Sequence, residues 1–281
     1  MSSAQTDQDA AVAPPPLEVF TQDNVDEVEE SIRVKKEDEL APLFSGAAWA
    51  GTLLWDAAIH LTRRFLEKYR SEMDASDNQL RVIELGAGMY VTLSETNGLS
   101  WMMTRTLWLR SGVPGMAARI AGARHVVITE QDDLLELMHR NLGDNSEVLR
   151  IGEVFPEAEH GAIHARPLSW GIEETTHYLQ AHGGEVYDVI LSCDCIYEPL
   201  YGQSWKALAQ TMELLCEANT KALVMMGVER RNADGIDKFL AFVKSDTKLT
   251  CELVEETYGA NNNLLQLYYL HLPVATETSF Q

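Results

Sequence analysis

The stretch Arg81-Val-Ile-Glu-Leu-Gly-Ala-Gly88 decides the fold of this 281-residue chain. Its first five residues form a short, mostly apolar run that is typical of a buried strand, and the run ends directly in a glycine turn. Glycines at such a turn let the backbone approach a ligand closely. The stretch therefore indicates an α/β sheet with a ligand site at the carboxyl end of this strand.

Further strands and helices alternate along the chain on both sides of this stretch. Strands are expected at 125–129, 163–166, 187–191 and 222–226, and helices at 51–66, 132–141, 205–216 and 235–243. Two strands at 249–254 and 264–272 end the pattern without a helix between them. The order predicts a Rossmann-like, seven-stranded, mostly parallel sheet with helices on both faces and an antiparallel C-terminal hairpin.

The composition limits the classes of partner. The chain has 43 Asp and Glu against 22 Lys and Arg, which gives a net charge of −21, and 46% of its residues are hydrophobic. That hydrophobic fraction is enough for a packed core and excludes wholesale disorder. The negative charge disfavours nucleic acid as the main partner, because phosphate binding needs clustered Lys and Arg. It suits a basic protein partner, or solubility alone.

Two parts of the chain are expected. Residues 1–40 carry eleven acidic and three basic residues and are interpreted as a largely flexible leader, and residues 41–281 as one domain. Residues 1–16 lack the basic and apolar pattern of a secretory signal. The uncharged stretch at 43–55 is shorter than the roughly 20 apolar residues that span a membrane. Together with four cysteines without C-x-x-C spacing, this predicts a cytoplasmic protein, with the nucleus as the alternative.

Polar and aromatic residues follow three neighbouring strands, where a ligand of an open α/β sheet lies. Glu84 precedes Gly86 by two residues, Glu130 ends the second strand, and Ser169 and Trp170 follow the third. A carboxylate at Glu130 can accept both ribose hydroxyls, and an indole can cover a purine. Each signal alone also fits an ordinary turn or core residue, but together they predict a nucleoside pocket.

The type of nucleoside follows from the glycine pattern. The sequence Gly86-Ala-Gly-Met-Tyr-Val91 lacks the third glycine of the dinucleotide fingerprint. A carboxylate at Glu84 would repel a pyrophosphate, whereas it suits a cationic sulfonium and its amino-acid part. The pocket is therefore interpreted as a site for S-adenosylmethionine.

At this point the chain resembles methyltransferase family 16, which includes protein-lysine methyltransferases that act on chaperones, elongation factors and AAA ATPases. The resemblance spans about residues 46–272 and rests on Glu84-Leu-Gly-Ala-Gly88, Trp55 in LLWDAA, Glu130, Leu168-Ser-Trp-Gly171 and Asp194-Cys-Ile-Tyr197. It implies that the cofactor is contacted by Trp55, Gly86, Ala87, Gly88, Glu130, Trp170 and Cys193. It also implies that Asp194 and Tyr197 shape the acceptor site.

The chemistry of Asp194-Cys-Ile-Tyr197 agrees with a lysine acceptor. Lysine has a reference pKa of about 10.4, so its amine must lose a proton before it attacks the methyl group. A carboxylate and a backbone carbonyl can hold the amine, and the face of a tyrosine favours a cation. The alternative is a purely structural role, in which Asp194 caps a turn and Tyr197 packs in a loop.

An atypical insertion interrupts the glycine-rich turn. Residues 90–111 lie between Gly88 and Gly112-Val-Pro-Gly115, and without them the two glycine segments form a continuous turn into a helix. A loop of this length at the ligand's closest approach is unusual. We interpret it as a translated intron or gene-prediction artefact, and the alternative is a genuine apolar lid over the cofactor.

The expected function is a cytosolic S-adenosylmethionine-dependent methyltransferase acting on a lysine of a protein. Two alternatives are open: methylation of a nitrogen in a small molecule, and a catalytically impaired scaffold if residues 90–111 obstruct the site. No metal is expected, because the eight histidines show no ligand spacing with acidic residues or cysteines. Nucleic acid and membrane are not expected partners.

Overall fold

The computed structural model describes residues 56–75, 77–88, 112–149, 162–259 and 262–273. The predicted leader at 1–40, the cofactor residue Trp55 and the insertion at 90–111 lie outside these ranges. The boundary between leader and domain therefore stays a prediction. The helix predicted at 51–66 is described from Asp56 onward, as α4 (Asp56–Met73).

A seven-stranded sheet forms the centre of the molecule, in the order β3-β2-β1-β4-β5-β7-β6. Its strands are β1 (Arg81–Leu85), β2 (His125–Glu130), β3 (Ala162–Pro167), β4 (Val189–Cys193), β5 (Leu223–Glu229), β6 (Thr250–Tyr258) and β7 (Leu264–His271). The first five strands run parallel, and β7 pairs antiparallel with both β5 and β6. The predicted Rossmann-like sheet and its antiparallel C-terminal hairpin are confirmed.

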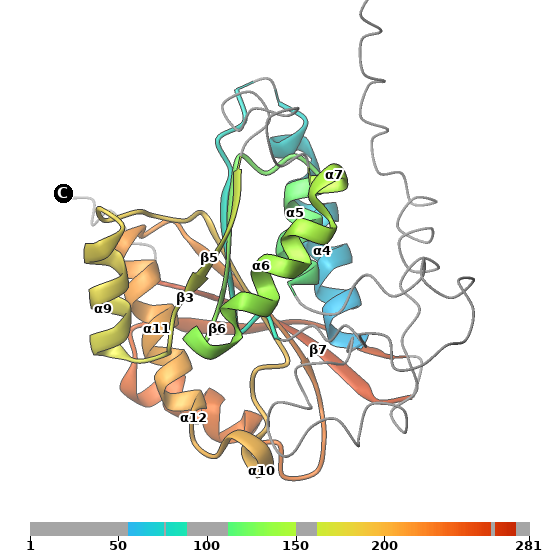
Figure 1. Cartoon of the computed structure of the whole chain (residues 1–281). Helices are drawn as coiled ribbons and strands as arrows, with labels where there is room; N and C mark the ends of the chain where they lie inside the picture. The colour runs from blue at the N-terminus through green and yellow to red at the C-terminus, as the bar shows by residue number, and fades with distance from the viewer. Residues whose placement is uncertain (1–55, 76, 89–111, 150–161, 260–261, 274–281) are drawn as a thin grey trace, which may run out of the picture.

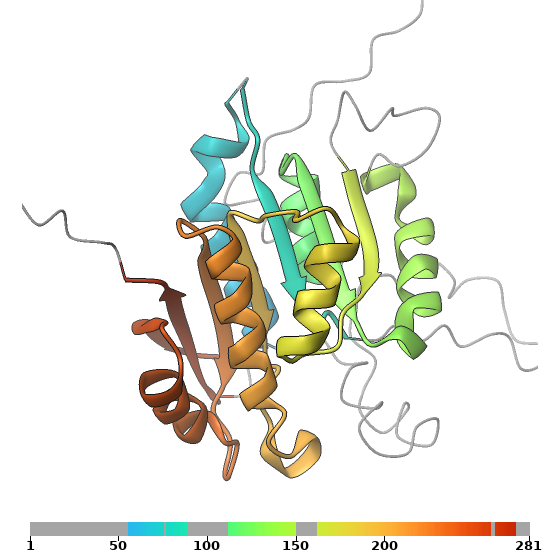
Figure 2. The same cartoon turned by 90° about the vertical axis from the view of Figure 1, so that its left-hand side faces the viewer.

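Helices cover both faces of this sheet (Figures 1 and 2). One face carries α4, α5 (Val113–Ile120), α6 (Leu135–Asp144) and α7 (Ser146–Leu149). The other carries α9 (Ile172–Ala181), α11 (Trp205–Ala218) and α12 (Ile236–Asp246). Short helices η2 (Asp132–Leu134) and α10 (Glu198–Tyr201) follow the ends of β2 and β4. Crossovers of this kind place the carboxyl ends of all parallel strands at one edge.

The alternation of side chains along each strand explains why both faces need helices. In β1, Ile83 and Leu85 pack into a core cluster with α9, α11 and α12, whereas Val82 packs into a second cluster with α4 and α5. A strand with both faces buried reads as a nearly continuous apolar run, which is why β1 could be predicted from sequence.

The sequence prediction lacks helix α9 and the short helices α7 and α10. Helix α9 buries Thr175 and Tyr178, which are three residues apart, and has acidic Glu173 and Glu174 in its first turn. These are the spacing and the charge placement of an amphipathic helix, and they were available in the sequence. The helix was overlooked because its buried residues are polar or aromatic rather than aliphatic.

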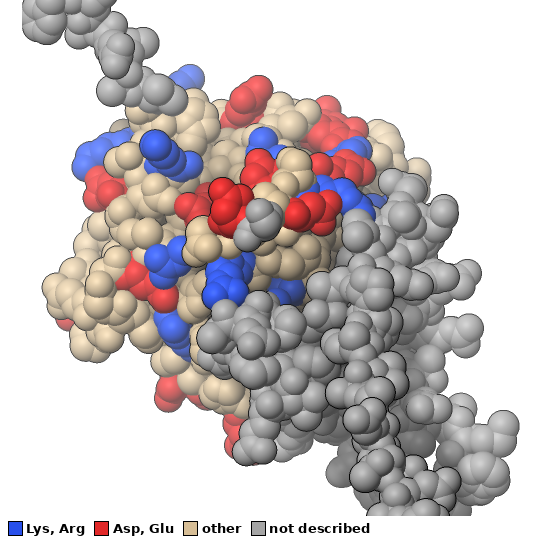
Figure 3. Space-filling model, turned by 90° about the horizontal axis from the view of Figure 1, so that it is seen from above, with Lys and Arg blue, Asp and Glu red and all other residues tan. Residues whose placement is uncertain are grey.

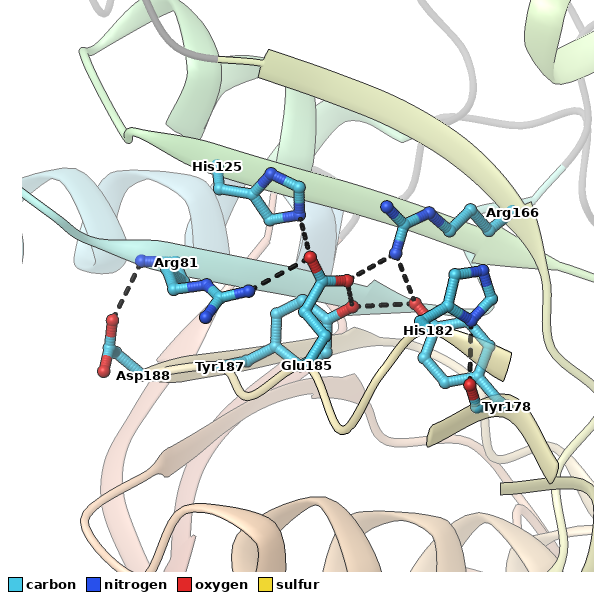
Figure 4. A network of polar contacts seen from close by, with 8 residues as sticks. All are labelled: Arg81, His125, Arg166, Tyr178, His182, Glu185, Tyr187 and Asp188. Carbon is cyan, nitrogen blue, oxygen red and sulfur yellow. Dashed lines mark hydrogen bonds and ion pairs between the residues drawn. The ribbon is translucent and has the colours of Figure 1, made fainter. Parts of the chain in front are cut away.

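The amino ends of the strands are held by an ion network around Glu185 (Figure 4). Its carboxylate lies 3.0 Å from Nη2 of Arg81, at the start of β1, and 2.9 Å from Nε2 of His125, at the start of β2. Arg166 of β3 also pairs with it, and the hydroxyl of Tyr187 donates a hydrogen bond of 2.7 Å. The network connects three parallel strands.

Seen from above the view of Figure 1, acidic and basic side chains are interspersed over the described surface (Figure 3).

In Figure 1, α10 follows the carboxyl end of β4 and lies at the lower edge of the molecule. Strand β1 lies between β2 and β4. The chain passes from β1 to β2 and β3 on one side, and then returns to β4 on the other side of β1. This reversal creates the crevice in which open α/β sheets bind their ligands. Of the helices that the structure describes, none has the length and apolar character to cross a membrane.

Candidate active site at the carboxyl ends of the strands

The glycine turn after β1 has a backbone that only glycine adopts without strain. Gly86 and Gly88 have φ of +65° and +78°. A Cβ on Gly86 would lie 2.8 Å from Sγ of Cys195 and 2.8 Å from Cζ2 of Trp170. The turn is therefore wedged between the end of β4 and the segment after β3, where the sequence placed it.

The two halves of the interrupted glycine motif meet in space. The N–H of Gly112 donates a 2.8 Å hydrogen bond to the carbonyl of Ala87, and α5 begins at the next residue. If residues 90–111 were removed, Ala87 and Gly112 would be the first and fourth residues of a β-turn closed by this same bond. This contact supports the interpretation of residues 90–111 as an insertion into a continuous turn.

Glu84 lies beneath this turn. Its side chain is 2% exposed, and Oε2 accepts a 2.8 Å hydrogen bond from the N–H of Gly115 in the first turn of α5. Burial raises the pKa of Glu84 to about 8, and the nearby charge of Glu130 acts in the same direction. Glu84 is thus largely neutral at pH 7 until a cation approaches it.

Glu130, at the end of β2, faces the same turn. Its Oε2 accepts a 2.9 Å hydrogen bond from the N–H of Gly88, and its Oε1 accepts one of 2.9 Å from the N–H of Gln131. Burial raises the pKa of Glu130. The structure therefore brings Glu84 and Glu130 to the glycine turn from adjacent strands.

The segment after β3 closes the third side. Trp170 is half-buried and packs against Gly86, while Ser169 is exposed. The N–H of Gly171 donates 2.9 Å to the hydroxyl of Thr211 in α11, which fixes the course of the chain after Trp170. The indole thus lies beside the glycine turn, and Ser169 contributes no contact to it that the structure records.

The carboxylates around the glycine turn fit S-adenosylmethionine. Burial and neighbouring carboxylates raise the pKa values of Glu84 and Glu130, and hydrogen bonds from backbone N–H groups lower them only in part. A cation bound here would relieve that unfavourable negative charge, which suits a sulfonium and a free amino group. When bound, this cofactor supplies an activated methyl group. Trp170, which packs against Gly86, and the carboxylate of Glu130 would face its nucleoside end.

At the end of β4, Asp194 is held in a specific backbone conformation. Its φ is +50°, in the left-handed region that aspartate tolerates better than most residues. Its N–H donates 2.8 Å to the carbonyl of Gly227, and its Oδ1 accepts 3.0 Å from the N–H of Glu229, both in β5. Burial raises the pKa of Asp194, which the hydrogen bond and charge of Arg231 only partly offset.

The sequence analysis missed two functional candidates, Glu229 and Arg231. Glu229 is the last residue of β5, and Arg231 follows two residues later. The Nη2 atom of Arg231 is 2.7 Å from Oδ2 of Asp194 and 3.3 Å from Oε2 of Glu229. Its guanidinium carbon lies 5.6 Å from the centre of the Tyr197 ring. The signal that could have identified them is the charged run Glu229-Arg230-Arg231 after the buried strand.

Cys195, one of the two cysteines that flank Asp194, connects the segment after β4 with the glycine turn. Sγ of Cys195 donates to the carbonyl of Leu85 at 3.3 Å and lies 3.8 Å from that of Gly86. Burial raises the pKa of Cys195 to about 12 and that of Cys193 well above its ordinary value. Both are neutral thiols that line the crevice, and neither has the ionisation of a nucleophile.

Within the described ranges, no group of three or more His, Cys, Asp and Glu side chains is arranged to hold a metal ion.

Comparison with known proteins identifies the family. A family model described as lysine methyltransferase, methyltransferase family 16, matches residues 109–246. The chain belongs to this family. It is an S-adenosylmethionine-dependent methyltransferase of the Rossmann-like class. The matched region begins at the end of the 90–111 insertion and includes the Asp194–Tyr197 motif.

A curated relative and two solved structures are similar to the chain. Secreted RxLR effector protein 48 from Plasmopara viticola is 63% identical over 164 residues, which are 58% of this chain and 82% of that protein. The delta-N METTL16 methyltransferase domain has 11% identity and a TM-score of 0.43, over 74% of this chain and 81% of that one. The rRNA methyltransferase aviRa from Streptomyces viridochromogenes has 12% identity and a TM-score of 0.43, over 84% and 94%. The two structures say nothing about the substrate of this chain.

Proposed function

We propose that this family 16 methyltransferase transfers the methyl group of S-adenosylmethionine to the side-chain amine of a lysine in a protein. One observation carries the proposal. After β4, in the segment whose Cys195 contacts the glycine turn, the buried carboxylates of Asp194 and Glu229 and the ring of Tyr197 surround a cationic side chain, that of Arg231. Carboxylates and an aromatic face are the groups that recognise an alkylammonium ion.

The donor side orients the cofactor. Glu84 and Glu130 approach the glycine turn from β1 and β2, and Trp170 packs against Gly86 from the segment after β3. We assign Glu84, Glu130, Trp170, Ser169, Cys193 and the Gly86–Gly88 turn, with Ala87, to cofactor binding. Trp55 is assigned to the same site on the family resemblance alone.

The acceptor side prepares the amine. A lysine ammonium bound between Asp194 and Glu229 must release a proton before its nitrogen has a lone pair to attack with. Burial raises the pKa of Glu229, so its carboxylate is a better proton acceptor than an exposed glutamate. Tyr197 covers one side of the amine, and transfer is then a displacement that depends on alignment.

Labelled transfer tests this function. The full chain is incubated with S-adenosylmethionine that carries a labelled methyl group and with a cell lysate. Label in a discrete protein band, located on lysine by mass spectrometry, is the expected result. Label in small solutes alone would favour a small-molecule N-methyltransferase, and the absence of label in every fraction would favour a scaffold.

Partner and location are part of the proposal. The net charge of −21 supports a basic protein target, such as a chaperone, elongation factor or AAA ATPase, rather than nucleic acid or a membrane. We propose a cytoplasmic or nuclear location. The 63% identical relative is named a secreted effector, which supports the opposite location. Immunodetection of the chain in cell and secreted fractions separates the two.

A further inference from the structure

Arg231 occupies the place where the proposed function puts the substrate amine. Its guanidinium makes contacts of 2.7 Å and 3.3 Å to the carboxylates of Asp194 and Glu229 and lies 5.6 Å from the centre of the Tyr197 ring. These are the same three groups that would bind an alkylammonium ion. A second cation could not use them while the guanidinium stays in place.

We propose that Arg231 is an internal occupant of the acceptor site, and that a lysine substrate binds by displacing its guanidinium. The inference rests on the proposed function for the identity of the displacing group. It makes Arg231 a specificity-determining residue, because an acceptor must bind the carboxylates well enough to replace it.

Burial determines which partner moves. The side chains of Asp194 and Glu229 are 3% and 6% exposed, whereas that of Arg231 is 19% exposed and is more accessible than either carboxylate. Asp194 is also fixed by backbone bonds to Gly227 and Glu229, and Glu229 accepts a hydrogen bond from Asn263. The carboxylates therefore stay in place when the guanidinium leaves.

The charges of the cluster favour replacement of the Arg231 guanidinium by another cation. Two carboxylates face one guanidinium, so the cluster carries a net negative charge with Arg231 in place and a larger one without it. Burial raises the pKa of Glu229 even though the Arg231 guanidinium lies beside it. A free alkylammonium ion would restore the balance after displacement.

Arg230 provides a matched control. It neighbours Arg231 in the chain, but its Nε lies 3.0 Å from Oδ2 of Asp234 and its Nη1 3.0 Å from Oδ1 of Asp237. Those acids belong to the start of α12 and lie outside the acceptor cluster. Removing Arg230 tests the effect of losing an arginine next to the site without emptying it.

Chemical rescue of Arg231→Ala tests the inference without cofactor or turnover. The probe is n-butylamine, which has the length and charge of a lysine side chain, with an equal concentration of sodium chloride as the control for ionic strength. We expect the amine to raise the unfolding temperature of Arg231→Ala by about 2–4 °C at tenfold excess over its dissociation constant. The wild type and Arg230→Ala should show a smaller rise at the same concentration, because there the amine must first displace the guanidinium of Arg231.

Two outcomes would overturn the inference. Rescue by methylguanidine but not by n-butylamine would make Arg231 a permanent brace that no lysine replaces. The absence of rescue by either compound would show that the emptied cluster takes no cation. If Arg231→Ala does not fold, Arg231→Gln, which keeps a hydrogen-bond donor without the charge, takes its place in the same comparison. Failure of labelled transfer would concern the proposed function alone, because the rescue needs no methyl donor.

Discussion

The two ends of the sheet both contain buried carboxylates beside arginines, but the balance of charge differs. Before β4, Glu185 faces Arg81 and His125, which begin β1 and β2, and Arg166, which lies toward the carboxyl end of β3 (Figure 4). Burial alone would raise the pKa of Glu185, but the hydrogen bonds from Tyr187 and Arg166 and the charge of His125 hold it below its ordinary value. At the carboxyl ends, two carboxylates share the guanidinium of Arg231, and the pKa of each is raised.

This difference distinguishes a stabilising ion network, that of Glu185, from a reaction site. A carboxylate that is compensated by two arginines and a tyrosine hydrogen bond is stable as it stands and gains nothing from a further ligand. Carboxylates that are short of positive charge gain from a cationic ligand, and both the methyl donor and a lysine acceptor are cations. The same residue types therefore serve stability at one end and binding at the other.

The largest effect on stability is expected from removing the carboxylate of Glu185, the shared partner in the ion network. Glu185→Ala leaves Arg81, His125 and Arg166 without their shared partner, and we expect a loss of about 2–4 kcal/mol in the free energy of unfolding. Urea denaturation measures it. Glu217→Ala, which breaks an exposed pair with Lys248, is the control and should cost less than about 1 kcal/mol. Equal losses in the two variants would contradict the role of Glu185 as a brace.

At the other end, Asp194→Asn should affect catalysis more than folding. Asparagine tolerates the left-handed backbone and can keep the bond to the N–H of Glu229, but it removes the charge opposite Arg231. We expect labelled methyl transfer to fall about 100-fold or more. Affinity for S-adenosylmethionine, measured by calorimetry, should stay within a few-fold. A parallel loss of both would place Asp194 in the cofactor site instead.

The glycine turn gives a smaller, steric effect. Gly86→Ala places a methyl group against Cys195 and Trp170, in a backbone conformation that alanine adopts poorly, and should destabilise the fold by about 1–3 kcal/mol. Gly183→Ala is matched, because its φ is +67° and nothing lies within 4 Å of the added Cβ. Thermal unfolding should rank Gly86→Ala below Gly183→Ala; the same unfolding temperature for both would mean that the close packing is unimportant.

A pH dependence from Glu84 is the remaining expected effect, and its direction is the quantity to test. Because its folded pKa of about 8 lies above its ordinary value, the native state binds more protons than the unfolded state between these values. Wild-type stability should therefore fall, relative to Glu84→Gln, as the pH rises from 5 to 8, by at most about 1.4 kcal/mol per pH unit. Parallel stability curves for the two proteins would contradict a neutral, buried Glu84.

The sequence predicted the sheet well because β1, β2, β4 and β5 are short, mostly apolar runs. It also placed Gly86, Glu130 and Trp170 at one site, since the carboxyl ends of parallel strands share an edge. Helix α9 was missed because its buried face, with Thr175 and Tyr178, is not aliphatic.

The acceptor cluster could not be predicted from the sequence in full. The partnership of Arg231 with Asp194 joins residues 37 positions apart, on strands that are neighbours only after the sheet has formed. A single charged residue after a strand gives no sign of which carboxylate it will face. The choice between Arg230 and Arg231 depends on the direction in which each side chain leaves the end of β5.

Titration of S-adenosylmethionine into the full chain, and into a variant without residues 90–111, tests the central claim most directly. Isothermal calorimetry should show saturable binding of one molecule per chain to the shortened variant, since Gly112 already bonds to Ala87 at 2.8 Å and the turn stays closed. Binding to the full chain as well would make the insertion compatible with function, and binding to the shortened variant alone would make it an obstruction. A folded sample of both proteins that releases no heat would contradict the assignment of the carboxyl ends of the strands as a methyl-donor site.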